Sequence, residues 1–472
     1  MNDLRTAQMQ LLDRLHHRAT QSPQAIAYVD AGTTEKLTWA QLFHRTAGFA
    51  IVLRSKLSAG AVVLIRLPNC CDFPVAFLGT LAAGCTAFPI SIEAPDAEVH
   101  ELGTQVHPAG IISFRAESFD GCIIPQDALR SEAMDFPDPQ IAPDGIGLML
   151  LSSGSTGKPK IVCRSFASLD AACDQMCRSI GIGPEDRVLA TVPLCHSYGI
   201  EHGLLAPVWA GAAVHLGRGM DLQLIQRELL QSRITLLPAV PSVYEMLANL
   251  LTHGEHFPSL RAAYSAGAPL PTSVADRFFD RCGIKIGQLF GATEIGSVTY
   301  SDPTHSHFNL ASVGQPMPGV EIKIVDEHLW ISASSMFSGY LHEDIPQTVD
   351  GFYPTGDLAR LDDHGNLIIT GRAKLLIDVG GLKVNPLEVE QVLMQHPAVG
   401  DCIVIPVRQS ETVVRLKAIV TQRSADQPIS IELLRQFARD RLASYKVPRS
   451  FEVRANLPRT QTGKILRQQV QA

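Results

Sequence analysis

The stretch "SSGSTGKPK", from Ser152 to Lys160, places two glycines, four hydroxyl side chains and two lysines after an apolar run. Small residues let backbone N–H groups approach an anion, hydroxyl groups donate hydrogen bonds, and Lys158 adds positive charge. The spacing departs from a Walker A loop, because Gly154 and Gly157 are only three apart and Pro159 follows Lys158. The stretch is therefore either a loop that grips phosphates or a polar surface turn.

Two further stretches carry single residues suited to the same chemistry. His196 in "TVPLCHSYG" is expected just past a strand end, where sites of α/β proteins open; the alternative is an ordinary buried histidine. Glu294 follows Thr293 in "GQLFGATEIGS", within a loop flanked by glycines. Beside a polyphosphate it is best explained as a Mg²⁺ ligand, because Mg²⁺ prefers oxygen and takes few protein carboxylates. The alternative is a solvated loop acid.

The second half of the chain adds a carboxylate and two cations. Asp357 follows a Thr-Gly pair that predicts a turn, and from there it could accept hydrogen bonds from both hydroxyls of a ribose. Arg372 is expected to end a strand, and Lys464 follows Gly463 in a polar loop. A solvated surface lysine is the alternative for Lys464. Small residues in "YSAGAPLP" (264–271) would let the backbone approach a flat ring, with Phe290 covering one face.

Alternating strands and helices are predicted to position these residues. Strand-like runs occupy 61–67, 86–90, 145–151, 187–194 and 212–217, and runs with helical periodicity occupy 72–84, 168–181 and 222–233. This alternation predicts an α/β fold in which helices cover largely parallel sheets. From about residue 310 the pattern changes to a hairpin at 319–333, strands within 365–384, 402–408 and 415–422, and helices at 386–399 and 430–442. We expect a large domain at 1–371 and a small α+β domain at 372–472.

Composition limits the function classes. The 472 residues carry a net charge of −7 without a long basic run, which argues against a nucleic-acid or membrane-surface role. Ten scattered cysteines form no CxxC pair, so neither zinc nor a thioredoxin-like site is indicated, and buried thiols in a reducing compartment are expected. The N-terminal segment lacks the apolar core of a signal peptide, and no stretch is long enough to span a membrane. A cytoplasmic enzyme is expected.

In this order and spacing the stretches resemble the adenylate-forming superfamily, which includes acyl- and aryl-CoA synthetases, adenylation domains of peptide synthetases, and luciferases. The resemblance covers almost the whole chain, from "LTWAQL" (37–42) through "FLGTLAAGCTAFPI" (77–90) to the loop of Lys464. It implies a large layered domain with a β-barrel-like subdomain, and a small mobile C-terminal domain. It also implies ATP, Mg²⁺ and a thiol, from CoA or the phosphopantetheine of a carrier protein, as reactants.

The resemblance assigns a role to each matching residue. The phosphate-binding loop comprises Ser152, Ser153, Gly154, Ser155, Thr156, Gly157, Lys158 and Lys160, and the adenine pocket comprises Ser265, Ala266, Gly267, Ala268, Pro269, Phe290 and Gly291. Catalytic roles fall to Lys464, His196, Thr293 and Glu294 (the Mg²⁺ ligand), and the ribose contacts fall to Asp357 and Arg372. Lys374 matches the hinge and Gly381 the loop that faces the thioester site. The candidates for the acid pocket are Ser197, Tyr198, Ile200, Gly267, Gly291 and Ile295.

The implied reaction brings one anion to another, because a carboxylate attacks a triphosphate. Mg²⁺, Lys464 and the loop donors would neutralise that repulsion and form an acyl-adenylate with release of pyrophosphate. Rotation of the small domain about Lys374 would then withdraw Lys464 and admit the thiol.

Departures from the family's patterns narrow the range of expected substrates. Amino-acid-activating members place an Asp beside the position of His196, whereas this chain has Ser197, and a buried ammonium without a counter-ion would be costly. A fatty acid is favoured, and an aryl acid is the alternative because "HSY" is similar to aryl-acid ligases. A catalytically silent adenylate binder is a further alternative, which the presence of Glu294 and Lys464 disfavours. Asp378, where many members carry Lys, makes a luciferase-like oxidation unexpected.

Overall fold

The computed structural model describes residues 9–115, 119, 121–137, 145–152, 160–217, 220–342, 348–379, 382–408, 414–424, 426–460, 463 and 465–470. The chain divides into two compact units. The first comprises Met1–Glu321 and Ser332–Gln347, and the second comprises Ile322–Ile331 and Thr348–Ala472. The domain boundary expected at residue 372 falls inside the second unit and stays a prediction about where the chain hinges.

A nine-stranded sheet forms one layer of the first unit, in the order β15-β14-β13-β12-β11-β9-β10-β1-β2. The six strands from β13 to β1 are parallel, and β2, β14 and β15 are antiparallel to their neighbours. Its strands are β1 (Ile26–Asp30), β2 (Lys36–Thr38), β9 (Arg187–Ala190), β10 (Ala213–Leu216), β11 (Leu236–Ala239), β12 (Ala262–Ser265), β13 (Ile286–Ala292), β14 (Gly296–Ser301) and β15 (Gln315–Pro316).

A seven-stranded sheet forms the second layer, in the order β18-β8-β7-β4-β3-β5-β6. The five strands from β7 to β6 are parallel, whereas β7 and β8 form an antiparallel pair. The strands are β3 (Val62–Arg66), β4 (Thr86–Pro89), β5 (Gly110–Ser113), β6 (Cys122–Ile124), β7 (Ile146–Leu151), β8 (Ile161–Ser165) and β18 (Gly339–Tyr340). The strands expected at 61–67, 86–90, 145–151, 187–194 and 212–217 are confirmed, with ends trimmed by up to four residues.

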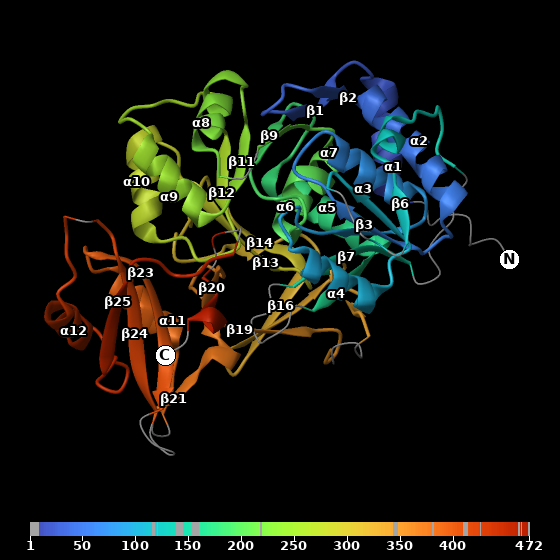
Figure 1. Ribbon diagram of the computed structural model, residues 1–472. Helices are drawn as coiled ribbons and strands as arrows, with labels where there is room; N and C mark the ends of the chain where they lie inside the picture. The colour runs from blue at the N-terminus through green and yellow to red at the C-terminus, as the bar shows by residue number, and fades with distance from the viewer. Residues whose placement is uncertain are drawn as a thin grey trace. The chain divides into compact units, whose positions relative to one another are not determined.

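Helices cover the faces of both sheets (Figure 1). The helices α8 (Leu222–Gln231), α9 (Pro241–Leu250) and α10 (Thr272–Cys282) bury one apolar stripe each against β11, β12 and β13. The remaining helices are α1 (Gln10–Gln21), α2 (Trp39–Lys56), α3 (Asp72–Ala82), α4 (Asp96–Val106), α5 (Phe166–Ile180), α6 (Ser197–Ile200) and α7 (Ala206–Ala210), with the 3₁₀ turn η1 (Gln126–Arg130) and the π turn η2 (Glu201–Leu205). The mixed α/β architecture is therefore confirmed. None of the helices in the described residues is both long and apolar enough to cross a membrane.

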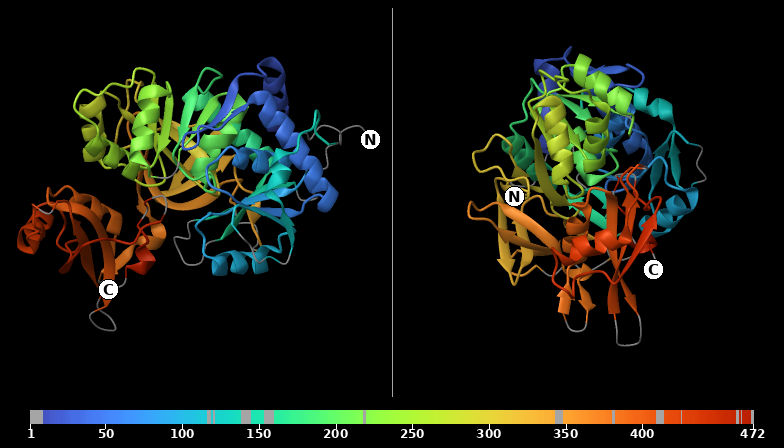
Figure 2. Two further views of the ribbon diagram at one scale, coloured as in Figure 1. Left: turned by 45° about the horizontal axis from the view of Figure 1, so that its top comes forward. Right: turned by 90° about the vertical axis from the view of Figure 1, so that its left-hand side faces the viewer.

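The second unit is smaller and mostly antiparallel. A four-stranded sheet takes the order β16-β17-β19-β20, a two-stranded ribbon joins β21 and β22, and a three-stranded sheet takes the order β23-β24-β25. Helices α11 and α12 lie beside the three-stranded sheet (Figure 2), and their apolar residues share one core cluster with those of β23 and β24. The elements are β16 (Val320–Val325), β17 (His328–Ala333), β19 (Tyr353–Leu361), β20 (Leu367–Arg372), η3 (Ala373–Leu375), β21 (Ile377–Val379), β22 (Leu382–Val384), α11 (Pro386–Met394), β23 (Val399–Arg408), β24 (Val414–Gln422), α12 (Ile431–Arg439), β25 (Ser450–Arg454) and η4 (Arg467–Gln469).

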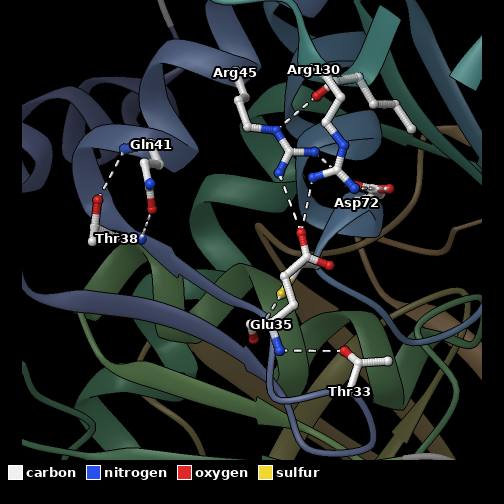
Figure 3. Close-up of polar contacts among 9 residues, drawn as sticks. Thr33, Glu35, Thr38, Gln41, Arg45, Asp72 and Arg130 are labelled. Carbon is white, nitrogen blue, oxygen red and sulfur yellow. Dashed lines mark hydrogen bonds and ion pairs between the residues drawn. The ribbon is translucent and has the colours of Figure 1, made fainter. Parts of the chain in front are cut away.

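A cluster of charged side chains ties the N-terminal elements of the first unit together (Figure 3). Arg45 of α2 forms a buried ion pair with Asp72 of α3, and its Nε donates to the carbonyl of Leu129 at 2.8 Å. Arg130 reaches the same carboxylate at 3.2 Å and Glu35 at 2.9 Å. Arg45 and Asp72 are buried, whereas the Arg130 side chain is 52% exposed. The two arginines of one cluster thus differ in how strongly water screens them.

Replacing Arg45 with methionine is expected to lower the free energy of unfolding by about 3 kcal/mol, because it leaves the buried Asp72 without its main partner. Arg130→Met removes an exposed partner of the same carboxylate, so its cost should stay below about 1 kcal/mol. Urea denaturation of both variants measures the difference. Equal losses would show that burial does not set the strength of these contacts.

Candidate active site

The stem of the predicted phosphate-binding loop is a β-hairpin formed by β7 and β8. The backbone N–H of Ser152 donates to the carbonyl of Lys160 at 2.8 Å, and the N–H of Lys160 donates to Ser152 Oγ at 3.1 Å. These two bonds hold the ends of the loop together. The predicted phosphate-binding residues Ser153, Gly154, Ser155, Thr156, Gly157 and Lys158 lie outside the described residues.

Thr293 and Glu294 lie in the tight turn between the antiparallel strands β13 and β14. The turn is closed by a hydrogen bond of 3.1 Å from the N–H of Ile295 to the carbonyl of Ala292. Gly291 is required because an added Cβ would lie 2.3 Å from the carbonyl oxygen of Gly296. The glycines flanking the turn thus permit a close approach of the two strands, and the loop expected here is confirmed as a hairpin turn.

Tyr340 of β18 links the Glu294 turn to the end of the phosphate-binding loop. Its hydroxyl donates to Glu294 Oε1 at 3.0 Å, and the Nζ of Lys160 lies 4.4 Å from the centroid of its ring. The N–H of Phe337 donates to the carbonyl of Glu294 at 2.8 Å. Tyr340 therefore contacts both the Glu294 carboxylate and Lys160 at the end of the loop.

The oxygen chemistry around Glu294 fits Mg²⁺ held mainly by phosphates. Glu294 is half-buried, and its Oε1 accepts from Tyr340. Within the part of the chain that the structure describes, His, Cys, Asp and Glu form no group of three or more that could hold a metal ion. A single carboxylate agrees with the coordination of Mg²⁺ in nucleotide sites, where substrate phosphates and water supply most of the ligands.

His196 precedes the short helix α6, six residues after the end of β9. Its Nε2 atom is buried and has no hydrogen-bond partner among the described residues. Burial lowers the pKa of His196, which favours the neutral ring at physiological pH. Gly199 permits the close packing of α6 on the preceding loop, because an added Cβ would lie 2.0 Å from the carbonyl oxygen of Pro193.

The acid-pocket candidates do not all have the same exposure. The hydroxyl of Tyr198 donates to the carbonyl of Tyr264 at 3.0 Å, which anchors its half-buried ring at the end of β12. Ile200 and Ile295 are fully buried and can only back a pocket wall, whereas Ser197 is half-buried and Gly291 exposed.

The adenine-pocket candidates end or follow β12, or lie in β13. Ser265 is buried at the end of β12, and its Oγ has no hydrogen-bond partner among the described residues. The backbone then turns through Gly267, whose φ of 86° is in the left-handed region that favours glycine. Ala266 is buried, Gly267, Ala268 and Pro269 are exposed, and Phe290 is half-buried. Since β12 and β13 are parallel, this edge of the sheet is where α/β proteins bind ligands.

In the second unit, Asp357 and Arg372 are directly opposite each other on β19 and β20. Arg372 Nε lies 2.7 Å from Asp357 Oδ1, with the aspartate buried and the arginine half-buried. The prediction of a turn before Asp357 is wrong, because Thr355 and Gly356 belong to β19. Gly356 has a φ of 75°, so the strand accommodates this irregular position without breaking.

The other predicted residues of the second unit are described only in part. Lys374 lies in the 3₁₀ turn η3, directly after Arg372 ends β20 as expected. The side chain of Lys374 and the residues Gly381 and Lys464 lie outside the part of the chain that the structure describes. The chain on either side of Lys464 is anchored, because Ile465 bridges to Arg459 and the N–H of Leu466 donates to the carbonyl of Pro458 at 2.8 Å.

Sequence reasoning missed three residues of this region: Tyr340, Arg164 and Glu201. Arg164 and Glu201 form an ion pair of 2.5 Å with both side chains buried. A signal was present, because each charge interrupts an apolar run, in "IVCRS" and in "GIEHGLLAP". Charged residues are almost never fully buried unless they are paired, so the two interruptions call for a partner.

Comparisons with known proteins identify the family of the chain. Residues 15–341 match the family model described as AMP-binding enzyme, and residues 388–464 match that of the AMP-binding enzyme C-terminal domain. The chain is 29% identical to feruloyl-CoA synthase from Amycolatopsis sp, over 96% of each chain. It is 28% identical to medium-chain fatty-acid–CoA ligase from Escherichia coli, over 96% of this chain and 88% of the relative.

Among solved structures, o-succinylbenzoate CoA synthetase from Bacillus subtilis in complex with its acyl-adenylate intermediate superposes with a TM-score of 0.86. The sequences are 25% identical, and the match covers 97% of each chain. The family match spans the loop stem, the Glu294 turn and the surroundings of His196. The chain belongs to the AMP-binding enzyme family.

Proposed function

We propose that this protein is an ATP-dependent acid–thiol ligase. In the first step a carboxylate oxygen attacks the α-phosphorus of ATP, an acyl-adenylate forms, and pyrophosphate leaves. In the second step a thiol attacks the acyl carbonyl, a thioester forms, and AMP leaves. Both steps balance without an oxidant or a reductant.

The observation that carries this proposal is the meeting of Glu294, Tyr340 and Lys160. It connects one half-buried carboxylate, through Tyr340, to the end of a loop rich in glycine and hydroxyl groups. That combination suits a polyphosphate with its cation, because Mg²⁺ takes few protein carboxylates and shares its remaining positions with phosphate oxygens.

Each group has a role in the first step. Bound Mg²⁺ would neutralise charge on the phosphates and on the departing pyrophosphate. Glu294 would hold that ion, and Thr293 and the loop from Ser152 to Lys160 would orient the phosphates. The small residues from Ser265 to Pro269 together with Phe290 would bind adenine, and Asp357 with Arg372 would bind ribose. Lys464 would act as a point charge between carboxylate and α-phosphate.

The acid is proposed to lack an α-amino group. Glu201 is the first carboxylate after His196, and its oxygens already accept from Arg164 and from Ser297. A substrate ammonium would therefore find no available counter-ion there, and burying it unpaired would be costly.

A fatty acid is the first candidate and an aryl acid the second. The similarity to a medium-chain fatty-acid–CoA ligase supports the first. One structural feature favours the aryl acid. The rings of Tyr198 and His202 make an edge-to-face contact with centroids 4.9 Å apart, and the ring centroids of His202 and Tyr264 are 5.3 Å apart. A rigid group of rings suits a flat substrate, because aromatic pairs prefer edge-to-face or offset contacts at such distances.

CoA is the proposed thiol, because the relatives named above are CoA ligases. A carrier protein's phosphopantetheine arm presents the same thiol and is the second candidate. All ten cysteines are free, which suits the reducing cytoplasm proposed as its location.

Acid-dependent ATP–pyrophosphate exchange over a panel of fatty, aryl and amino acids tests the proposal. We expect exchange with fatty or aryl acids and none with amino acids, followed by thioester formation with CoA. Absence of exchange across the panel, together with tight binding of ATP or acyl-adenylate, would favour a silent binder instead. Thioester formation with a carrier protein but not with CoA would show that the carrier protein, rather than CoA, supplies the thiol.

A further inference from the structure

An ion pair in the interior of the first unit has no part in the roles assigned so far. Arg164 of β8 and Glu201 of the π turn η2 lie 2.5 Å apart, and both side chains are essentially unexposed. Replacing such a pair by apolar residues of similar volume is often neutral or stabilising, because desolvation offsets the attraction. Its presence therefore points to a role in geometry rather than in overall stability.

Glu201 holds the strand that leaves the Glu294 turn. Its Oε2 accepts from the backbone N–H of Ser297 at 3.1 Å and from Ser297 Oγ at 2.9 Å. Gly296 allows this approach, since an added Cβ would lie 3.0 Å from Glu201 Oε1 and 3.3 Å from Arg164 Nη2. The start of β14 is thus fixed against the ion pair.

Arg164 also holds the turn, through one intermediate residue. Its Nη2 donates to the carbonyl of Ser335 at 3.1 Å, and Ser335 Oγ donates to the carbonyl of Ile295 at 2.9 Å. Ile295 follows Glu294 directly, and Ser335 is buried. Hydrogen bonds therefore hold the turn at two residues. Arg164 acts on Ile295 through Ser335, and Glu201 binds Ser297 directly.

His202 fixes the direction of the remaining hydrogen bonds. Because Ser297 Oγ donates to Glu201, it must accept from His202 Nε2, 3.1 Å away, which leaves His202 Nδ1 to accept from the Tyr264 hydroxyl at 3.2 Å. Burial lowers the pKa of His202 to about 4, opposed by the nearby Glu201, so the ring is neutral as this pattern requires. One ordered chain thus runs from Tyr264 to Arg164.

We propose that Arg164 and Glu201 are positioning residues that set the orientation of the Glu294 carboxylate for Mg²⁺–ATP. The inference rests on the proposed function. The pair joins three segments: the strand that follows the phosphate-binding loop, the π turn η2 that follows α6, and the hairpin that carries Glu294. Loss of such outer contacts typically lowers metal affinity or activity by about 10- to 100-fold.

The test replaces the pair by apolar side chains in the double variant Arg164→Met/Glu201→Leu. Calorimetric titration with ATP, in EDTA and in excess Mg²⁺, measures how much Mg²⁺ tightens nucleotide binding. We expect the affinity in EDTA to stay within about twofold and the gain from Mg²⁺ to fall by at least about tenfold. Thioester formation from a supplied acyl-adenylate should stay within about threefold, because that step does not use the metal.

A matched control replaces another buried pair of the first unit, in Arg45→Met/Asp72→Leu. It should alter thermal stability without altering the gain from Mg²⁺. If the Arg164 variant does not fold, Ser335→Ala removes the hydroxyl bond to Ile295 without touching a buried charge, and a loss of about threefold in the Mg²⁺ gain is expected.

The outcomes separate the two proposals. Absence of acid-dependent exchange in the unmodified protein would overturn the proposed function. Exchange in the unmodified protein, with an unchanged Mg²⁺ gain in the double variant or, if that does not fold, in Ser335→Ala, would overturn the positioning role. An equal loss of Mg²⁺ gain in the control pair would also overturn it, by showing that any buried charge has this effect.

Discussion

Replacing Lys464 with alanine is expected to lower acid-dependent ATP–pyrophosphate exchange by about 10²- to 10³-fold, the usual effect of removing one electrostatic contact to a developing charge. In the first step a carboxylate approaches a phosphate, so the lysine charge matters most there. Thioester formation from a supplied acyl-adenylate needs mainly positioning, because that carbonyl is already activated. We therefore expect the second step to be largely spared. Rates of both half-reactions, measured separately, test this division.

Two further lysine variants serve as controls for Lys464→Ala. Lys56→Ala removes an exposed lysine from the last turn of α2 and should leave both half-reactions unchanged. Lys158→Ala should slow exchange less than Lys464→Ala, because the loop has several other donors to phosphate. Equal loss in exchange and in thioester formation for Lys464→Ala would refute the division of labour.

Replacing Glu294 with glutamine is expected to slow exchange by about 10²-fold, a loss similar to that of one preorganised electrostatic contact. The amide keeps the shape and the acceptor oxygen for Tyr340, so the turn should remain in place. It loses the negative charge that Mg²⁺ prefers. The concentration of Mg²⁺ needed for half-maximal exchange should therefore rise, and titration with Mg²⁺ measures it.

The control for this variant is Glu321→Gln, which makes the same chemical change at an exposed position. It should leave the Mg²⁺ dependence unaltered. Unchanged Mg²⁺ dependence in Glu294→Gln would remove Glu294 from the metal site, and a matching loss of thermal stability would assign it a structural role instead.

The local signals in the sequence were sufficient for most secondary structure. The glycines around Thr293 and Glu294 predicted a loop, and a hairpin turn is present because Gly291 leaves no room for a side chain. The apolar run before Ser152 predicted a strand, which is β7. The turn before Asp357 was wrong, because a Thr-Gly pair has the same local preference in a turn and in an irregular strand. Pairing with β17 and β20 decided between them.

The sequence by itself determined the family, the order of the chemical groups and the elements that carry them, since these depend on residue type and short-range spacing. Only the tertiary structure decided which distant residues meet. The contact of Tyr340 with Glu294 spans 46 positions, and that of Glu201 with Ser297 spans 96. No local preference encodes such contacts, because sheet pairing and burial create them. The ion pair of Arg164 with Glu201 is stable only inside that packed core, where each charge is without water and needs the other.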